Sequence, residues 1–225
     1  MCDEELEHIR HGAGNDPSMI QPRQQLVLAL KPKAPEFLRQ LLRTGRSDHR
    51  VGLALDDQGD LVSFRRGLDA MGAILKPRAS QMYVMPGNHE SVDDIAEFCS
   101  RHGFHDFHGR SMEIGGVHVA GLGYSSPTPF NTPGEYSEEE IAERLGPFAG
   151  MNPLVLICHA PPLDSKLDRV HEGLHAGSRA VREFIEKNRP RDFFCGHIHE
   201  AEGIVEQIGA TRAMNVGKRG YLLEL

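Results

Sequence analysis

Short apolar runs that alternate with helical patterns limit the folds open to this chain more than any other feature. The runs at 26–30, 51–55 and 81–85 are each followed by a helical pattern, at 36–42, 67–75 and 91–102. Further runs at 153–158 and 192–195 flank a helical pattern at 178–187. Strands that are apolar on both faces need cover from helices, so the sequence predicts a layered α/β fold.

Turn and capping residues add detail to this plan. Gly115 and Gly116 lie between short alternating segments and predict a hairpin, hence antiparallel strands beside the parallel ones. Ser137 and Glu140 match a capping box, which predicts a helix starting at Ser137. The proline-rich segment SSPTPFNTP at 125–133 predicts a loop, either on the rim of a cleft or as a solvated connection.

Length and composition narrow the class of protein. With 225 residues, 39% of them hydrophobic and 25% charged, we expect one globular domain at 23–225, preceded by a loose arm at 1–22. The formal net charge of −7 argues against a broad surface for duplex nucleic acid. No apolar run approaches the ~20 residues of a membrane span, and the opening residues contain no basic leader, so we expect a cytoplasmic protein without a membrane partner.

The four cysteines are far apart and form no CxxC pair, which argues against a zinc knuckle or a thioredoxin-like site. Cys158 and Cys195 each end an apolar run. We expect both to be small buried hydrophobic residues rather than reactive thiols.

Polar side chains directly follow three of the predicted strands, in YVMPGNHE, VLICHAPP and FFCGHIHE. The carboxyl ends of strands in an α/β sheet border the crevice where ligands bind. We therefore expect five residues to converge there: Asn88, His89, His159, His197 and His199. Imidazole nitrogens and an amide oxygen are typical metal ligands. One histidine at a strand end is usually a hydrogen-bonded turn residue, but three such segments favour a metal site.

Neighbouring residues predict the local geometry of these segments. Gly87 and Gly196 are expected to turn the backbone sharply off their strands. His197 and His199 are two residues apart and face the same side if the segment is extended, so both would approach neighbouring metal ions.

In their order along the chain, these segments resemble the motifs of the calcineurin-like metallophosphoesterase family. Four of the five family motifs have counterparts within residues 59–199, in GDLV, GNHE, ICHAPP and GHIH, and the closing MNVGKRGYLLEL is similar to the family's terminal strand pair. The resemblance implies a four-layer α/β/β/α sandwich of two mixed β-sheets with helices on the outer faces.

The resemblance also implies a role for each matching residue. It makes Asp60 the carboxylate that bridges two metals. Asn88, His159 and His197 would complete one metal site, and His199 would belong to the other. His89 would be the acid near the leaving group, with Glu90 as a partner that fixes its ring.

The family's first motif, DxH, has no counterpart where it is expected. Lys31 and Pro32 follow the first predicted strand, where the family has an aspartate and its histidine neighbour. The first metal site is therefore expected to lack two ligands. Asp16 and the pair Asp48 and His49 are weak substitutes, because neither follows a strand.

The spacing around the GD motif leaves the bridging ligand open. The residues DDQG intervene between the second predicted strand and Asp60, so Asp56 or Asp57 is an alternative bridging ligand.

The chemistry that the resemblance implies is metal-assisted hydrolysis of a phosphoester by a phosphodiesterase or phosphatase. The substrate would be a small phosphoester or a nucleotide-like molecule. A nitrogen-rich site suits one or two Mn²⁺, Fe or Zn²⁺ ions per chain better than Ca²⁺ or Mg²⁺. An alternative is a catalytically weak or inactive member that acts as an interaction scaffold, and a third hypothesis is an altered N-terminus, through divergence or an error in the gene sequence.

A second candidate element lies in the loop at 163–184. Gly177 and Ser178 lie at the start of a predicted helix. The free backbone N–H groups there are a candidate phosphate cradle, with His175 and Lys166 assisting in substrate binding. The alternative is an ordinary helix N-cap surrounded by solvated charges.

Overall fold

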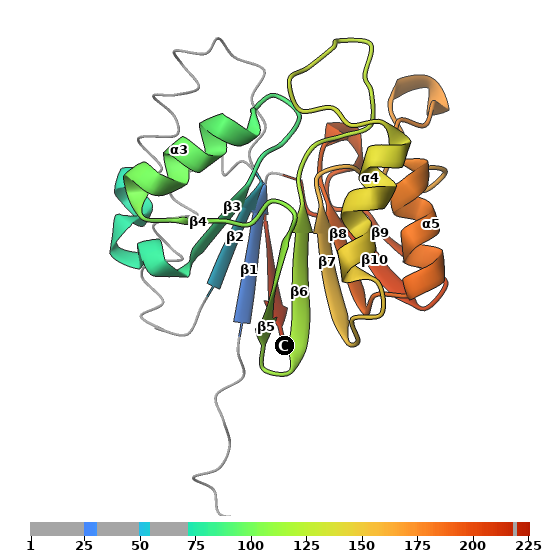
Figure 1. Ribbon diagram of the computed structural model, residues 1–225. Coiled ribbons are helices and arrows are strands. Elements are labelled where there is room, and N and C mark those ends of the chain that lie inside the picture. Colours follow the sequence, from blue (N-terminus) through green and yellow to red (C-terminus); the bar gives the residue numbers. More distant parts are fainter. Residues whose placement is uncertain (1–24, 31–49, 55–71, 218–219) are drawn as a thin grey trace, which may run out of the picture.

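The computed structural model describes residues 25–30, 50–54, 72–217 and 220–225 (Figure 1). Their strands form two sheets. The five-stranded sheet consists of β1 (Gln25–Leu30), β2 (Arg50–Ala54), β3 (Met82–Met85), β4 (His105–Asp106) and β11 (Tyr221–Glu224). The six-stranded sheet consists of β5 (Arg110–Ile114), β6 (Val117–Leu122), β7 (Leu154–Cys158), β8 (Asp192–Cys195), β9 (Val205–Ile208) and β10 (Thr211–Asn215).

In the described ranges, each sheet has a parallel centre, with one antiparallel edge strand in the first sheet and two in the second. The first sheet has the order β11-β1-β2-β3-β4, in which only β11 is antiparallel to its neighbour among the described strands. The second has the order β5-β6-β7-β8-β10-β9, in which β5 and β9 pair antiparallel with β6 and β10. The fold is therefore a mixed α/β fold, as predicted.

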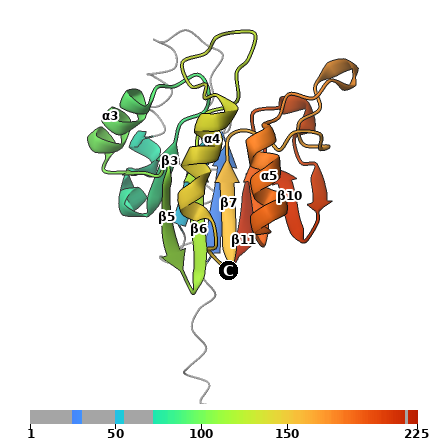
Figure 2. The same cartoon turned by 45° about the vertical axis from the view of Figure 1, so that its right-hand side comes forward.

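Three α-helices accompany the described strands: α3 (Val92–His102), α4 (Glu138–Leu145) and α5 (Arg179–Asn188). Helix α4 connects β6 to β7 and α5 connects β7 to β8, and the two helices lie side by side over the six-stranded sheet (Figure 2). Four short 3₁₀ helices follow in the connections: η2 (Lys76–Gln81), η3 (Gly146–Phe148), η4 (His171–Gly173) and η5 (His199–Ala201).

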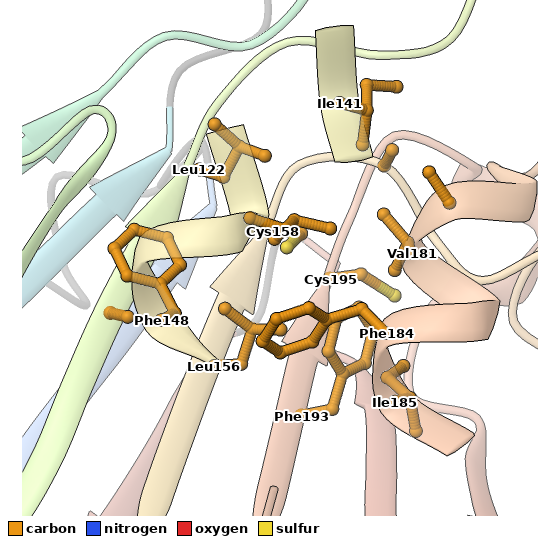
Figure 3. Packing of buried hydrophobic residues seen from close by; sticks show 14 of the residues in the cluster. Leu122, Ile141, Phe148, Leu156, Cys158, Val181, Phe184, Ile185, Phe193 and Cys195 are labelled. Atoms are coloured by element: carbon orange, nitrogen blue, oxygen red, sulfur yellow. The ribbon is translucent and has the colours of Figure 1, made fainter. Parts of the chain in front are cut away.

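Strand β7 shows how the two faces of its sheet are used. Leu154, Leu156 and Cys158 belong to a buried cluster with residues of α4 and α5 (Figure 3). Val155 and Ile157 belong to a second cluster, which also includes residues of β3 and β11 from the other sheet. Every residue of β7 is buried, because helices cover one face and a sheet covers the other.

The local signals of the sequence are confirmed. The capping box of Ser137 and Glu140 is formed, and Ser91 and Asp94 form another at the start of α3. Gly115 and Gly116 join β5 to β6 with positive φ angles of 57° and 79°. These glycines allow the left-handed backbone that tight hairpins need.

The end of the chain differs from the expected strand pair. Strands β10 and β11 lie in different sheets, because β10 pairs with β8 and β9 while β11 pairs with β1. The pattern of apolar residues in MNVGKRGYLLEL marks two strands but carries no information on their partners. Strand β9 was not expected from the sequence; it has an alternating burial pattern and lies at the edge of its sheet.

Several predictions concern residues outside the described ranges. The arm at 1–22, the helix at 36–42 and most of the helix at 67–75 are among them, so the complete four-layer sandwich stays a prediction. In the described ranges, no helix has both the length and the apolar character needed to cross a membrane.

Both cysteines that end apolar runs are buried as expected. Cys158 and Cys195 are free thiols in the cluster beneath α4 and α5. Burial raises the pKa of both thiols, which keeps them protonated and unreactive.

Candidate metal centre

The predicted metal ligands follow strands of two different sheets. Asn88 follows β3 in the five-stranded sheet, whereas His159 and His197 follow β7 and β8 in the six-stranded sheet. The Gly196 N–H donates to the carbonyl oxygen of His159 at 3.2 Å, which joins the ends of β7 and β8. The candidate centre therefore lies where the carboxyl ends of two packed sheets meet.

Three of the predicted ligands are close together. Asn88 Oδ1 lies 3.1 Å from His159 Nε2, and the rings of His159 and His197 are edge to face with centroids 5.0 Å apart. Asn88 and His159 are buried, with 3% and 1% of their surface exposed. Two ligands of one ion, each about 2.1 Å from the metal, are separated by about 3 Å. The spacing of Asn88 and His159 and their donor atoms therefore fit a divalent ion.

The backbone at His197 forms a tight turn. Its φ angle is 63°, and the Ile198 N–H donates to the Gly196 carbonyl oxygen at 2.7 Å, which closes a three-residue γ-turn. Positive φ at a residue with a side chain is strained and is typical of functional sites. Neither Gly87 nor Gly196 has positive φ; Gly196 is the first residue of this turn, and the left-handed position falls on His197.

Buried Asn215, at the end of β10, holds this turn. Its Nδ2 donates to the carbonyl oxygens of Gly196 at 3.1 Å and Ile198 at 2.9 Å, and its Oδ1 accepts the Gly217 N–H at 3.0 Å. All three bonds lie within the core, where an unmade hydrogen bond is costly. The sequence did not mark this residue as functional, because Asn215 ends a strand with the sequence TRAMN, which contains polar residues and is not one of the continuous apolar runs.

His199 is partly exposed and starts η5. The γ-turn and the 3₁₀ helix mean that His197 and His199 do not lie on an extended segment, so the geometric reason for placing both on one side is wrong. The role of His199 as a ligand of the other metal rests on the resemblance and stays a prediction.

His89 is partly exposed, and its neighbour Asn88, a predicted ligand, is buried. The next residue, Glu90, is fully buried, and its Oε2 accepts the Gly87 N–H at 2.7 Å. This bond holds the turn that carries Asn88 and His89. The expected action of Glu90 on the His89 ring stays a prediction.

The acidic part of the predicted centre falls outside the described ranges. This applies to Asp60 and its alternatives Asp56 and Asp57. The weak substitutes Asp16, Asp48 and His49 also lie outside these ranges, as do Lys31 and Pro32. Among the described residues, no three His, Cys, Asp or Glu side chains are grouped to hold a metal. The predicted ligands among the described residues are the amide of Asn88 and the imidazoles of His159 and His197, and the predicted carboxylate would complete this set.

The loop at 159–178 is organised by Asp168, which is completely buried. Its carboxylate accepts the Ser165 N–H at 3.0 Å, the Gly177 N–H at 3.0 Å and His175 Nδ1 at 2.7 Å. His175 is thereby held with 28% of its side chain exposed. Lys166 is exposed, and its backbone N–H donates to the side-chain carboxylate of Glu206 in β9 at 2.7 Å.

The N-terminus of α5 is occupied by groups of the protein itself. The buried Ser178 hydroxyl accepts the Val181 N–H at 3.2 Å, and Glu138 of α4 accepts both the Ser178 hydroxyl at 2.9 Å and the Ala180 N–H at 2.7 Å. This is the ordinary N-cap that the sequence left open. A phosphate bound there would have to displace the Glu138 carboxylate, and substrate binding by Ser178 stays a prediction.

The proline-rich segment forms a loop between β6 and α4 that rises above the carboxyl ends of the strands (Figure 1). The Gly134 N–H donates to the carbonyl oxygen of Asn88 at 2.8 Å, and Asn88 Nδ2 donates to Thr132 Oγ1 at 3.1 Å. Of the two alternatives left open by the sequence, this loop is the rim of the candidate centre rather than only a solvated connection.

The sequence profile described as Calcineurin-like phosphoesterase matches residues 31–201, which include the segments GDLV, GNHE, ICHAPP and GHIH. The chain belongs to the calcineurin-like phosphoesterase family. This membership accounts for the order of the motifs along the chain.

One curated protein and two solved structures are similar to this chain over most of its length. The uncharacterized protein MJ1162 of Methanocaldococcus jannaschii is 31% identical over 174 residues, which span 73% of this chain and 77% of that protein. Among solved structures, TT1561 of Thermus thermophilus aligns with a TM-score of 0.60 and 18% identity over 88% of this chain and 90% of that one. A putative 5′-nucleotidase from Staphylococcus aureus aligns with a TM-score of 0.58 and 13% identity over 88% of this chain and 49% of that one. At these identities the two structures show a shared fold.

Proposed function

We propose that this calcineurin-like phosphoesterase is a metal-dependent hydrolase of small phosphoesters, including nucleotide-like ones. The observation that carries the proposal is the convergence of Asn88 Oδ1 and His159 Nε2 at 3.1 Å, with the His197 ring beside them. The 5′-nucleotidase named above supports a small phosphoester as the substrate class.

Asn88, His159 and His197 would hold the ion, with Asp60 as the carboxylate ligand and His199 at a second site. Mn²⁺, Fe or Zn²⁺ suits these nitrogen-rich ligands, with one or two ions per chain. When bound, such an ion supplies charge that stabilises phosphoryl oxygens and generates hydroxide from water near neutral pH.

The protein's own side chains would exclude water, position the ligands, supply a proton and contact the substrate. Burial of Asn88 and His159 excludes water from the ligands, and Asn215 holds the turn that presents His197. His89, partly exposed next to Asn88, would hold the proton that the departing oxygen takes. His175, fixed by buried Asp168, would contact the substrate.

The proposal is tested by metal analysis of the purified protein together with hydrolysis of paired aryl phosphomonoesters and phosphodiesters. We expect bound metal and hydrolysis of at least one substrate class. Replacing His197→Ala should lower both, whereas His118→Ala, a change on β6 outside the centre, should lower neither.

Two outcomes would contradict this assignment. Unchanged metal content in His197→Ala would show that the ligand set is wrong. Full metal content without hydrolysis of either substrate class would instead favour the interaction scaffold.

A further inference from the structure

The carboxamide of Asn88 has a defined orientation. Its Nδ2 lies 3.1 Å from Thr132 Oγ1 and its Oδ1 lies 3.1 Å from His159 Nε2. A carboxamide rotated by half a turn would exchange these atoms, so that the amide nitrogen, which has no lone pair to offer a metal, would face His159. Only the orientation with the oxygen toward His159 makes Asn88 a ligand.

Thr132 selects this orientation because its own proton is committed elsewhere. Its hydroxyl donates to Glu135 Oε1 at 2.6 Å, and its backbone N–H donates to the same oxygen at 2.8 Å. A hydroxyl has a single proton, so with that proton on Glu135 the Thr132 oxygen acts toward Asn88 as an acceptor. The amide must then present its N–H₂ group to Thr132.

Glu135 is suited to accept the hydrogen bond from the Thr132 hydroxyl. Burial alone would raise its pKa, but hydrogen bonds from Thr128 and Thr132 outweigh this effect and lower the pKa to about 2. An ionised carboxylate only accepts hydrogen bonds, which fixes the direction of the chain from Asn88 through Thr132 to Glu135. The Thr128 hydroxyl donates to the same oxygen at 2.5 Å and does not take part in that chain.

We propose that Thr132 and Glu135 are positioning residues that turn the Asn88 carboxamide so that its oxygen faces the metal. The inference rests on the proposed function in one respect, because the ion is the one proposed there. It adds that the rim loop at 125–136, distant in sequence from every metal motif, sets the affinity of the centre. Partners of this kind typically change metal affinity by about 10- to 100-fold.

The test is a Mn²⁺ titration of the full chain by calorimetry, with thermal unfolding measured in parallel. Thr132→Val keeps the shape of the side chain but removes the acceptor, and we expect Mn²⁺ affinity to fall by about tenfold or more. Thr132→Ser restores the hydroxyl and should restore most of the affinity. Glu135→Ala frees the Thr132 proton and should also weaken binding.

Thr128→Val is the matched control, since it removes another hydroxyl bond to the same Glu135 oxygen without touching Asn88. We expect its Mn²⁺ affinity to stay within about threefold of wild type, well short of the effect of an outer-shell partner. Equal affinity in wild type and Thr132→Val, or equal losses in Thr132→Val and Thr128→Val, would overturn the inference. Absence of hydrolysis in a wild-type chain that binds Mn²⁺ would overturn the proposed function alone, and absence of Mn²⁺ binding would overturn both.

Discussion

At the scale of single residues, the candidate centre depends on atoms that their neighbours hold in place. His197 adopts a left-handed backbone angle, and the Asn88 carboxamide is turned by Thr132. Both conformations cost free energy unless surrounding hydrogen bonds compensate. Substitutions of residues that never touch a metal should therefore affect the centre.

His89 is the residue whose substitution should separate proton transfer from metal binding. We expect His89→Asn to slow hydrolysis of substrates with poor leaving groups by about 10²-fold, the usual scale of acid catalysis, because the departing oxygen then lacks a proton. Activated aryl esters should lose less activity, since their leaving groups depart as stable anions. Steady-state rates on both substrates and elemental analysis of bound metal check this. Equal losses on both substrates together with lost metal would make His89 a ligand or a structural residue.

Asn215 should matter through the two protons of its amide. Asn215→Asp puts a carboxylate oxygen against the carbonyl oxygens of Gly196 and Ile198, so we expect the free energy of unfolding to fall by about 1–3 kcal/mol or more. Metal occupancy at limiting metal should fall too, because the His197 turn loosens. Urea unfolding and elemental analysis measure these effects.

Asn188→Asp is the control for that substitution. Asn188 Nδ2 donates to Phe184 O at 3.1 Å near the end of α5, in a partly buried position outside the centre. It undergoes the same chemical change, and we expect unaltered metal occupancy. An equal loss of metal in both variants would contradict the role given to Asn215.

At the scale of elements, connections distant in sequence are fixed to one another. Glu138 in the first turn of α4 accepts two bonds at the N-terminus of α5, and these two helices form one cover over β6–β8 (Figure 2). The rim loop is likewise bonded to the turn after β3. The position of each loop thus depends on an element that is far away along the chain.

Gly134 is where the rim loop approaches the Asn88 turn most closely. A Cβ atom there would lie 2.6 Å from the Gly87 carbonyl oxygen and 2.8 Å from Asn88 Cα. Backbone atoms cannot move aside easily, so we expect Gly134→Ala to lower the free energy of unfolding by about 1–3 kcal/mol and to weaken metal binding. Thermal unfolding and Mn²⁺ titration are the measurements.

Gly146→Ala provides the comparison for this prediction. A Cβ atom at Gly146 meets nothing within 4 Å, and the residue has helical backbone angles of −48° and −47°. Its substitution should leave stability unchanged or slightly higher and metal binding unaltered. Similar losses in both variants would refute a specific contact at Gly134.

For the molecule as a whole, stability should depend on pH through His108, whose ring lies beside the rings of Tyr124 and Tyr136. The Gly123 N–H donates to its Nδ1 at 3.2 Å, and its Nε2 lies 3.1 Å from the Tyr136 hydroxyl. Burial lowers the pKa of His108 from 6.5 to about 4, with Arg144 adding to the effect and Asp106 opposing it. The folded protein thus favours the neutral ring.

The sign of the pH dependence follows from the proton count. Between pH 6.5 and about 4 the unfolded chain binds a proton at His108 and the folded chain does not, so stability falls as the pH is lowered through this window. The loss is at most about 3.5 kcal/mol, at about 1.4 kcal/mol per pH unit. Urea unfolding of wild type and His108→Gln from pH 7 to pH 4 should show the wild type losing its advantage. A difference that is constant with pH would contradict this assignment.

The local features of this protein can be predicted from its sequence. Apolar runs marked the strands, Ser137 and Glu140 marked a helix start, and paired glycines marked a hairpin, because these signals act over a few residues. The strand-end motifs likewise marked Asn88, His159 and His197 as candidate ligands, without placing any of them relative to the others.

Which of these residues are in contact can be seen only in the tertiary structure. Asn88 and His159 are 71 residues apart and follow strands of different sheets, so their 3.1 Å contact exists only once the two sheets pack. The left-handed angle at His197 depends in the same way on Asn215, and the orientation of Asn88 depends on Thr132, which is 44 residues away. A short segment of sequence encodes the periodicity of a strand or helix and its caps. When two side chains in contact are far apart in the sequence, their contact depends on how the elements pack, and no short segment contains that information.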